Sequence, residues 1–178
     1  MSTIQEAATV IPAGTYQVDP AHSSAEFAAT HMGISTVHGH FLKFEATLEG
    51  GDQPHVTGTI ETGSATTHDE QRDGHLKTPD FFDTERYPTA TFNGSLVAPD
   101  RLEGELTLKG VTKPIEMSAT ITGPASDPWG NDRVGIDLEG TVNRHDFGVD
   151  FNMDLPSGGK LLEDTVTLVA SLSFVKQA

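Results

Sequence analysis

One short motif carries side chains that could transfer a proton. In Arg72-Asp73-Gly74-His75 a carboxylate lies two positions before an imidazole, and an Asp that orients a His is part of several nucleophilic active sites. Residues two apart on a helix point to different faces, however. The chain has no Cys and no Gly-x-Ser-x-Gly motif to supply a nucleophile. The pattern favours helix capping or an ion pair, and we predict no catalytic residue and no enzyme activity.

A second motif could hold a metal ion. His38-Gly39-His40 places two imidazoles on one side of a strand, at a spacing that metal ligands use. Together with Gly33, Glu45 and Gly50 the segment loosely resembles the first cupin motif. Its glycine spacings differ, Glu45 has the opposite parity on a regular strand, and no second motif supplies another His. We therefore predict no metal site and no cofactor, and we keep a metal-dependent cupin-like enzyme using His38 and His40 as the alternative.

Polar residues also interrupt otherwise apolar strand faces. His31 has the parity of Phe27, and Arg144 has the parity of Val142, each at the end of a strand. A guanidinium is a planar fork that suits a phosphate or another polar head group. We expect His31, Arg144 and Arg72 to contact a ligand head group. The alternative is that they are rim residues bonded within the protein.

The elements that position these residues are strands. Large apolar residues alternate with polar ones, as in Leu42, Phe44, Ala46 and Leu48, and this period of two indicates strands with one buried face. Such a sheet must close on itself or stack on another. The expected strands are Thr15–Asp19, Ala25–His31, His38–Glu49, His55–Gly63, Thr89–Val97, Arg101–Lys109, Pro114–Thr122, Arg133–Arg144 and Thr165–Val175.

The inward face of these strands carries Gly or Ala at mid-strand positions. An eight-stranded barrel is just wide enough to be filled by side chains or to hold one small ligand, and a trimmed middle layer favours the ligand. The other interpretation is that strand glycines mark corners or bulges. The residues expected to line an apolar tunnel are Phe27, Ala29, Phe44, Ala46, Gly58, Ile60, Phe92, Gly94, Gly104, Leu106, Met117, Ala119, Leu138 and Ala170.

One segment, near residues 68–82, breaks the strand pattern. Thr67-x-x-Glu70 has the form of a capping box and predicts a short helix through about Lys77, and Thr78-Pro79 resembles a second helix start. Leu76, Phe81 and Phe82 would then form a lid over one end of the barrel. The equally physical alternative is that any barrel end needs apolar cover.

Charge restricts the partners. Lys and Arg total 11 against 26 Asp and Glu, a formal charge of −15, so a nucleic acid or an anionic membrane would repel the protein. No run of about 18 apolar residues predicts stable membrane insertion. Residues 1–13 lack the features of a secretion signal. We expect a cytoplasmic protein with a flexible tail over 1–13 and one domain over 14–178.

Several short blocks, in order, resemble the YceI-like family of polyisoprenoid-binding proteins. They are Tyr16-x-Val18-Asp19-Pro20-x-His22-Ser23, Phe27 with His31 and Gly39-x-Phe41, Arg72-Asp73-x-His75-Leu76, Asp80-Phe81-Phe82-Asp83, Tyr87-Pro88 with Phe92, Gly104-x-Leu106-Thr107-Leu108-x-Gly110-Val111-Thr112-Lys113-Pro114 and Asn143-Arg144-x-Asp146-Phe147-Gly148.

The resemblance implies an all-β fold, a single eight-stranded antiparallel lipocalin-like barrel. It also implies a long isoprenoid or fatty-chain lipid in the tunnel, carried or stored there, and a homodimer. Many members are exported to the periplasm, which the missing signal puts in question for this chain.

Overall fold

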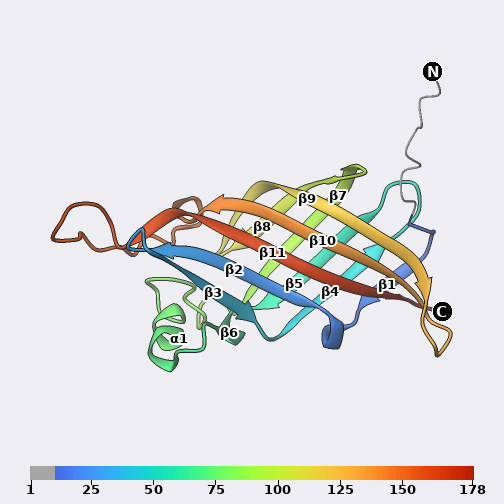
Figure 1. Cartoon of the computed structure of the whole chain (residues 1–178), viewed down its shortest axis with the longest axis horizontal. Helices are drawn as coiled ribbons and strands as arrows, with labels where there is room; N and C mark the ends of the chain where they lie inside the picture. The colour runs from blue at the N-terminus through green and yellow to red at the C-terminus, as the bar shows by residue number, and fades with distance from the viewer. Residues whose placement is uncertain (1–10) are drawn as a thin grey trace, which may run out of the picture.

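The computed structural model describes residues 11–178, which form eleven strands and one short α-helix (Figure 1). No helix within this range is long and apolar enough to cross a bilayer. The elements are β1 (Thr15–Val18), β2 (Ser24–His31), β3 (Ser35–Phe41), β4 (Phe44–Glu49), β5 (His55–Glu61), β6 (Ala65–Thr66), α1 (Glu70–Leu76), β7 (Thr89–Ala98), β8 (Arg101–Leu108), β9 (Val111–Ser126), β10 (Asp132–Asn143) and β11 (Leu162–Lys176).

Eight strands close into a ring. The order is β1-β4-β5-β7-β8-β9-β10-β11, and β1 pairs with β11 to complete it. Every pairing in the ring is antiparallel. The eight-stranded antiparallel barrel expected from the alternation is therefore confirmed, and closure leaves the ring without an edge strand.

One wall of the barrel is shared by two short strands. β11 pairs with β2 over Leu162–Ser171 and with β1 over Phe174–Lys176. Between them, a 3₁₀ turn at Pro20–His22 redirects the chain, and the Asp19 carboxylate caps it by accepting from the Ala21 amide. β2 continues into β3 and β6, which branch from the ring on one side.

The expected strand His38–Glu49 is two strands, because the chain bends at Leu42 and Lys43. The bend changes the parity: Phe41 and Phe44, three apart, both line interior cavities, whereas Leu42, expected inside, is 68% exposed. Strict alternation predicts faces only while the strand stays regular.

Two helix predictions also need correction. Asp69, not Thr67, caps α1 by accepting from the Arg72 amide, and residues 78–87 form turns instead of a second helix.

The end of the barrel near the C-terminus is densely packed. Tyr16, Leu48, Val134 and Phe174 are each no more than 1% exposed. Ile11 is buried among them. The flexible tail expected over 1–13 therefore does not extend to Ile11, and residues 1–10 lie outside the described residues. The apolar core therefore fills one half of the barrel.

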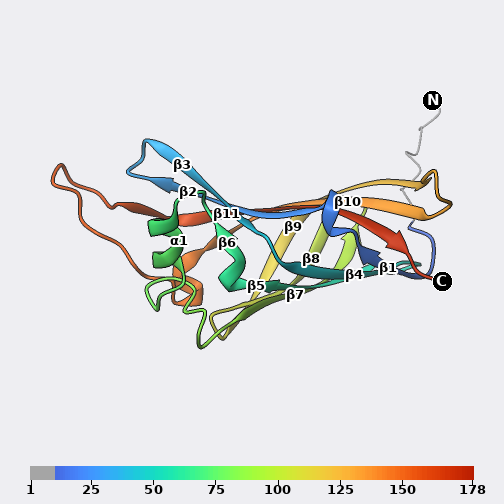
Figure 2. The same ribbon diagram turned by 90° about the horizontal axis from the view of Figure 1, so that it is seen from below.

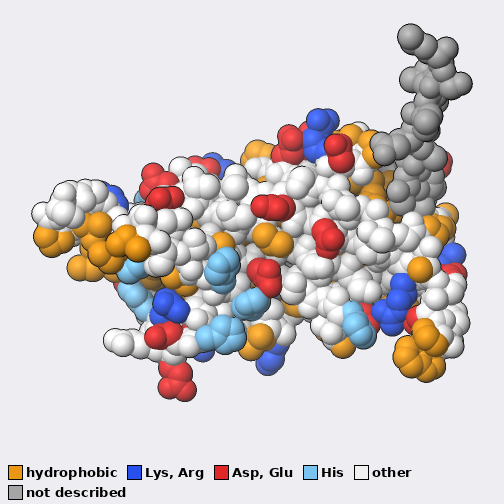
Figure 3. All heavy atoms as spheres, in the orientation of Figure 1, with side chains coloured by type: hydrophobic (Ala, Val, Ile, Leu, Met, Phe, Trp, Pro, Cys, Tyr) orange, Lys and Arg blue, Asp and Glu red, His pale blue; other side chains and the backbone are white. Residues whose placement is uncertain are grey.

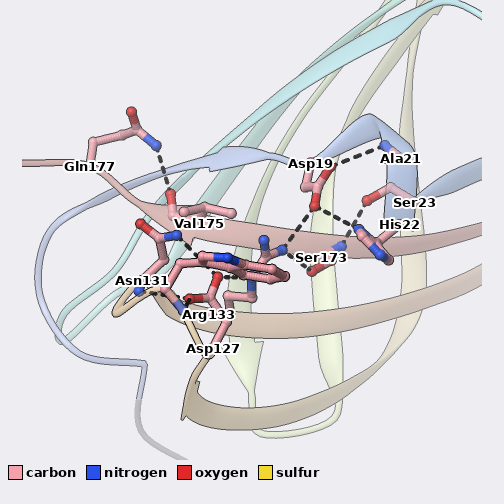
Figure 4. A network of polar contacts seen from close by, with 11 residues as sticks. Asp19, Ala21, His22, Ser23, Asp127, Asn131, Arg133, Ser173, Val175 and Gln177 are labelled. Carbon is pink, nitrogen blue, oxygen red and sulfur yellow. Dashed lines mark hydrogen bonds and ion pairs between the residues drawn. The ribbon is translucent and has the colours of Figure 1, made fainter.

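A polar network ties the strands together at the same end (Figure 4). Arg133 donates from Nη1 to Asp19 Oδ2 and from Nε to Asp127 Oδ2, both at 2.9 Å. Its hydrogen bond lowers the pKa of Asp19, with a further contribution from His22. Asp127 also accepts from the Trp129 and Asn131 amides in the β9–β10 turn. These contacts join the segment after β1 to β10 and to the β9–β10 turn.

Candidate functional site: an apolar cavity under a helical lid

The half of the barrel near α1 is hollow. A cavity of about 290 Å³ lies there, and a second of about 120 Å³ adjoins it deeper in the barrel. Phe41, Ile60, Leu106 and Leu168 line both. Aliphatic and aromatic side chains dominate both walls, so the interior offers length and apolar surface but few hydrogen bonds.

Most residues expected to line a tunnel lie on these two cavities. Phe27 and Ala29 line the larger one, and Ile60 and Leu106 line both. The others on the smaller cavity are Phe44, Ala46, Gly58, Phe92, Met117, Leu138 and Ala170. Parity along the strands was therefore a good guide to the interior.

Gly94, Gly104 and Ala119 line neither cavity. Ala119 is 4% exposed within the packed core. The two glycines pair with each other across β7 and β8, and a Cβ at Gly94 would lie 2.7 Å from the Phe92 ring. At these two positions, glycine makes room for neighbouring protein atoms and not for a ligand. This supports the other interpretation, that strand glycines are structural features of the barrel.

The three residues expected as a lid all line the larger cavity. Leu76 is buried on α1. The Phe82 ring packs edge-on against Phe27, with centroids 6.0 Å apart, and lies 5.8 Å from the Phe41 ring. Figures 1 and 2 place α1 at the barrel end away from the C-terminus. The segment therefore covers the hollow end.

An aromatic cluster joins this lid to the loop before β11. The His75 ring lies 4.9 Å from Phe81 and 4.7 Å from Phe151, and those two Phe rings are 5.4 Å apart. Its Nε2 is 2.8 Å from Asp80 Oδ2. We call His75, Phe81 and Phe151 the latch cluster, because it is the contact between two segments that meet over the cavity.

Asp73 does not orient His75. Burial alone would raise the pKa of Asp73, but hydrogen bonds from the Thr67 side chain and backbone, and from Thr66, outweigh burial and lower it. Asp73 thus fastens the helix to the segment before it. The structure favours the capping interpretation of the Arg72-Asp73-x-His75 motif over an acid–base pair.

Arg144 lines the larger cavity and is 5% exposed. It donates to three backbone carbonyls, from Nε to Glu163 and from Nη1 to Val149 and Phe151, at 2.8 to 2.9 Å. Its Nη2 is buried without an acceptor among residues 11–178. Burial lowers its pKa, and the charges of Asp164 and Asp150 act in the opposite direction. Arg144 therefore holds the loop before β11 in place.

His31 and Arg72 also line the larger cavity. His31 ends β2, opposite Leu162 and Ser35. Arg72 is exposed and anchored by Thr67, donating from Nε to Oγ1 at 2.7 Å and from Nη2 to the carbonyl at 2.9 Å. The three residues expected near a head group thus share one cavity.

The structure gives no support to the alternative metal site at His38 and His40. Gly39 faces inward against the Phe27 ring, so its two neighbours point out of the barrel. His40 Nδ1 lies 3.1 Å from Glu26 Oε1, and its ring is 5.8 Å from that of His68. Over residues 11–178, no group of three or more acidic, His or Cys side chains is arranged to hold a metal ion.

Sequence reasoning missed lining residues that lie outside regular strands. Phe147, Phe151 and Leu161 line the larger cavity. Phe147 belongs to a 3₁₀ turn, Arg144–Phe147, and the other two lie in the loop before β11. Periodicity does not apply to such segments. The one signal for Phe147 was its place in the Asn143–Gly148 block.

Comparison with known proteins gives a consistent result. A family model described as YceI-like domain matches residues 16–174. UPF0312 protein SA2479 of Staphylococcus aureus (strain N315) is 35% identical over 164 residues, which cover 89% of this chain and 96% of that protein. UPF0312 protein SAUSA300_2620 of strain USA300 is 36% identical with the same coverage.

Solved structures share the fold. A Campylobacter jejuni YCEI protein superposes with a TM-score of 0.67 at 27% identity, covering 84% of this chain and 90% of that one. Burkholderia cenocepacia BcnA gives 0.74 at 23% identity, covering 88% and 98%. A polyisoprenoid binding domain from Saccharophagus degradans gives 0.71 at 16% identity, covering 91% and 98%. At such identities, the last two show the fold alone.

Proposed function

The chain belongs to the YceI-like family, and from that premise we propose that its barrel binds one long apolar lipid of the isoprenoid type. The observation that carries this proposal is the pair of adjoining apolar cavities, about 290 and 120 Å³, under an aromatic lid. A concave, mostly apolar site with a few polar groups at one end is the usual form of a small-molecule site. The similar fold of the polyisoprenoid binding domain from Saccharophagus degradans supports the ligand class.

The physics of the cavity is sufficient for useful affinity. Each CH₂ group moved from water into an apolar wall contributes about 0.8 kcal/mol. About ten such groups contribute roughly 8 kcal/mol, and each further buried group adds to this total against the freedom that the ligand loses on binding. Such a wall discriminates poorly between one apolar chain and another. We therefore propose that chain length and head group, and not the detail of the tail, decide the ligand.

We place the polar end of the ligand at the mouth, near His31 and Arg72. Arg72 is an exposed cation on the larger cavity, so it can meet a phosphate or hydroxyl while the tail fills the interior. Arg144 adds positive charge to the same cavity. Because it donates to three loop carbonyls, its main role is to hold the loop before β11. The role proposed for the protein is to carry or store the lipid, and not to transform it.

The test is direct binding with a blocked cavity. Gly58 lines the smaller cavity, and a Cβ there would meet only ordinary contacts, 3.5 Å from the Glu45 carbonyl oxygen and 4.0 Å from Ala46 Cβ. Gly58→Leu should fold but fill the cavity, and it should weaken binding of a fluorescent prenol added from ethanol by at least about tenfold.

The matched control is Gly63→Leu, at an exposed glycine with nothing within 4 Å of the added Cβ. It should bind the prenol as the parent protein does. Equal affinity of folded Gly58→Leu and the parent would contradict the proposal. Mass spectrometry of the freshly purified protein, followed by organic extraction, would identify any lipid bound during expression and the oligomeric state.

A further inference from the structure

Large apolar side chains are exposed at the hollow end of the barrel. Met32, Ile34 and Met153 are 43%, 83% and 57% exposed. We call these three residues the apolar rim. The first two lie in the β2–β3 turn and the third in the loop before β11, and both segments project at the lid end of the barrel (Figure 1). Figure 3 shows hydrophobic side chains gathered on the parts that project there.

Backbone hydrogen bonds connect the apolar rim to the cavity wall. The Met32 amide donates to the Leu161 carbonyl at 2.7 Å, and the Leu161 amide donates to the Met153 carbonyl at 2.9 Å. Leu161 itself lines the larger cavity. The two parts of the rim are therefore neighbours, and both are joined through Leu161 to the wall of the larger cavity.

Met32 is an unfavourable choice for the fold at its position. The Ile34 amide bonds to the His31 carbonyl, and the two residues between them, Met32 and Gly33, have φ of 56° and 67°. Turns with two positive φ values favour Asn or Asp before Gly. A methionine here adopts a disfavoured backbone conformation and also exposes apolar surface. Neither property helps folding, so a role in contact explains both.

We propose that the apolar rim docks on the surface of an electrically neutral lipid bilayer and holds the cavity mouth against it. A long apolar lipid leaves a membrane slowly when it must cross water, and holding the hollow end of the barrel against the bilayer shortens that path through water. The formal charge of −15 opposes approach to an anionic surface. The bilayer on which the rim docks is therefore a neutral one. The purpose of docking rests on the proposed lipid-binding function, but docking itself can be measured without any ligand.

The experiment compares two variants of the full chain. The rim variant is Met32→Asn with Ile34→Thr. The control is Trp129→Ser, which removes another exposed apolar residue (82% exposed) from the β9–β10 turn at the opposite end of the barrel. Each protein is floated with phosphatidylcholine vesicles, and each is then timed as it takes up a fluorescent prenol from those vesicles.

We expect the rim variant to lose at least about fivefold in vesicle association and in uptake rate. Its affinity for prenol added from ethanol should stay equal to that of the parent, and its melting temperature should be unchanged or higher because Asn suits the turn. The Trp129→Ser control should behave as the parent, and phosphatidylglycerol in the vesicles should weaken association.

Four results would overturn the inference: a parent protein that does not float with neutral vesicles, a rim variant as fast as the parent, loss of docking in Trp129→Ser, or tighter association with anionic vesicles. A rim variant that changes only from dimer to monomer, with uptake unaffected, would instead assign the rim to a second copy of the chain. Absence of prenol binding from ethanol in every protein contradicts the lipid-binding function, while flotation still decides docking.

Discussion

Gly94 and Gly104 face each other across β7 and β8, and a Cβ at Gly104 would lie 2.5 Å from the Gly94 Cα. The same Cβ would overlap the Asn93 carbonyl oxygen. Backbone atoms cannot move aside as the end of a flexible side chain can. This pair therefore lets two strands of the wall approach at a point where no side chain fits.

Gly104→Ala should destabilise the barrel, by about 1–3 kcal/mol, because overpacking forces the backbone to shift. Urea denaturation measures the change. Gly58→Ala is the matched control, since its Cβ meets only ordinary van der Waals contacts, and it should stay within about 0.5 kcal/mol of the parent. Equal stability of the two variants would show that the strands separate easily at Gly104.

Arg144→Met should destabilise the lid end of the barrel. The change leaves the carbonyls of Val149, Phe151 and Glu163 without their donor, and each buried acceptor left unpaired costs about 1–3 kcal/mol. Limited proteolysis should cut the loop before β11 faster. Arg101→Met, at a half-exposed surface arginine, should have little effect. An intact loop in Arg144→Met would refute the holding role.

Phe81→Ala should speed release of a bound prenol. The ring is part of the latch cluster with His75 and Phe151, so its loss weakens the contact that closes the cavity, and aromatic pairs contribute about 0.5–1.5 kcal/mol each. We expect an increase of roughly threefold to tenfold in the dissociation rate, measured by stopped-flow transfer to an acceptor. An unchanged rate would mean that the ligand leaves by another path.

Arg72→Gln should lower the preference for a phosphorylated prenol over the free alcohol. Because the Arg72 guanidinium is exposed to solvent, its effect on the phosphate should be modest, about threefold to tenfold. Competition binding with the two ligands gives the ratio. Lys77→Gln, at an exposed lysine on the same segment that lines neither cavity, is the control for general charge. An equal loss for both ligands would place the head group elsewhere.

Stability should fall as the pH rises above about 6.5, through His145. Hydrogen bonds to Asp150 and then Asp164 raise its pKa above the ordinary value of 6.5. Because the pKa of His145 is higher in the folded protein than in the unfolded chain, its contribution to the free energy of unfolding is complete below about pH 6.5. That contribution disappears as the pH rises through the folded-state pKa. Melting temperatures from about pH 5.5 to about pH 9 should show this decline in the parent and not in His145→Gln. A decline of the same size in both would assign it to another group.

Regular strands were predictable because alternation reports which face of a strand is buried. Phe27, Ile60 and Leu106 lie on the cavities for that reason. Alternation does not report how closely two strands approach, and so Gly94 and Gly104 seemed to open space that Phe92 and the neighbouring backbone occupy. It also loses phase at a bend, as at Leu42.

Side-chain partners were harder to predict than faces. Arg144 has the parity of a tunnel residue and does line the cavity, but its donors are taken by carbonyls of a loop that has no periodic pattern. Likewise, Asp73 and His75 are close in sequence yet bond to Thr67 and Asp80. Such pairings depend on where irregular segments meet, which local sequence patterns do not encode.

The pairing of Tyr16 with Lys176 has a consequence for biosynthesis. The first strand of the ring finds its second partner only in the last strand, so the barrel cannot close until β11 has left the ribosome. Contacts so far apart in sequence make folding slow, and during synthesis β1 exposes the edge meant for β11. A nascent chain of this kind depends on protection of that edge, and its interior is enclosed only once β11 has paired with β1.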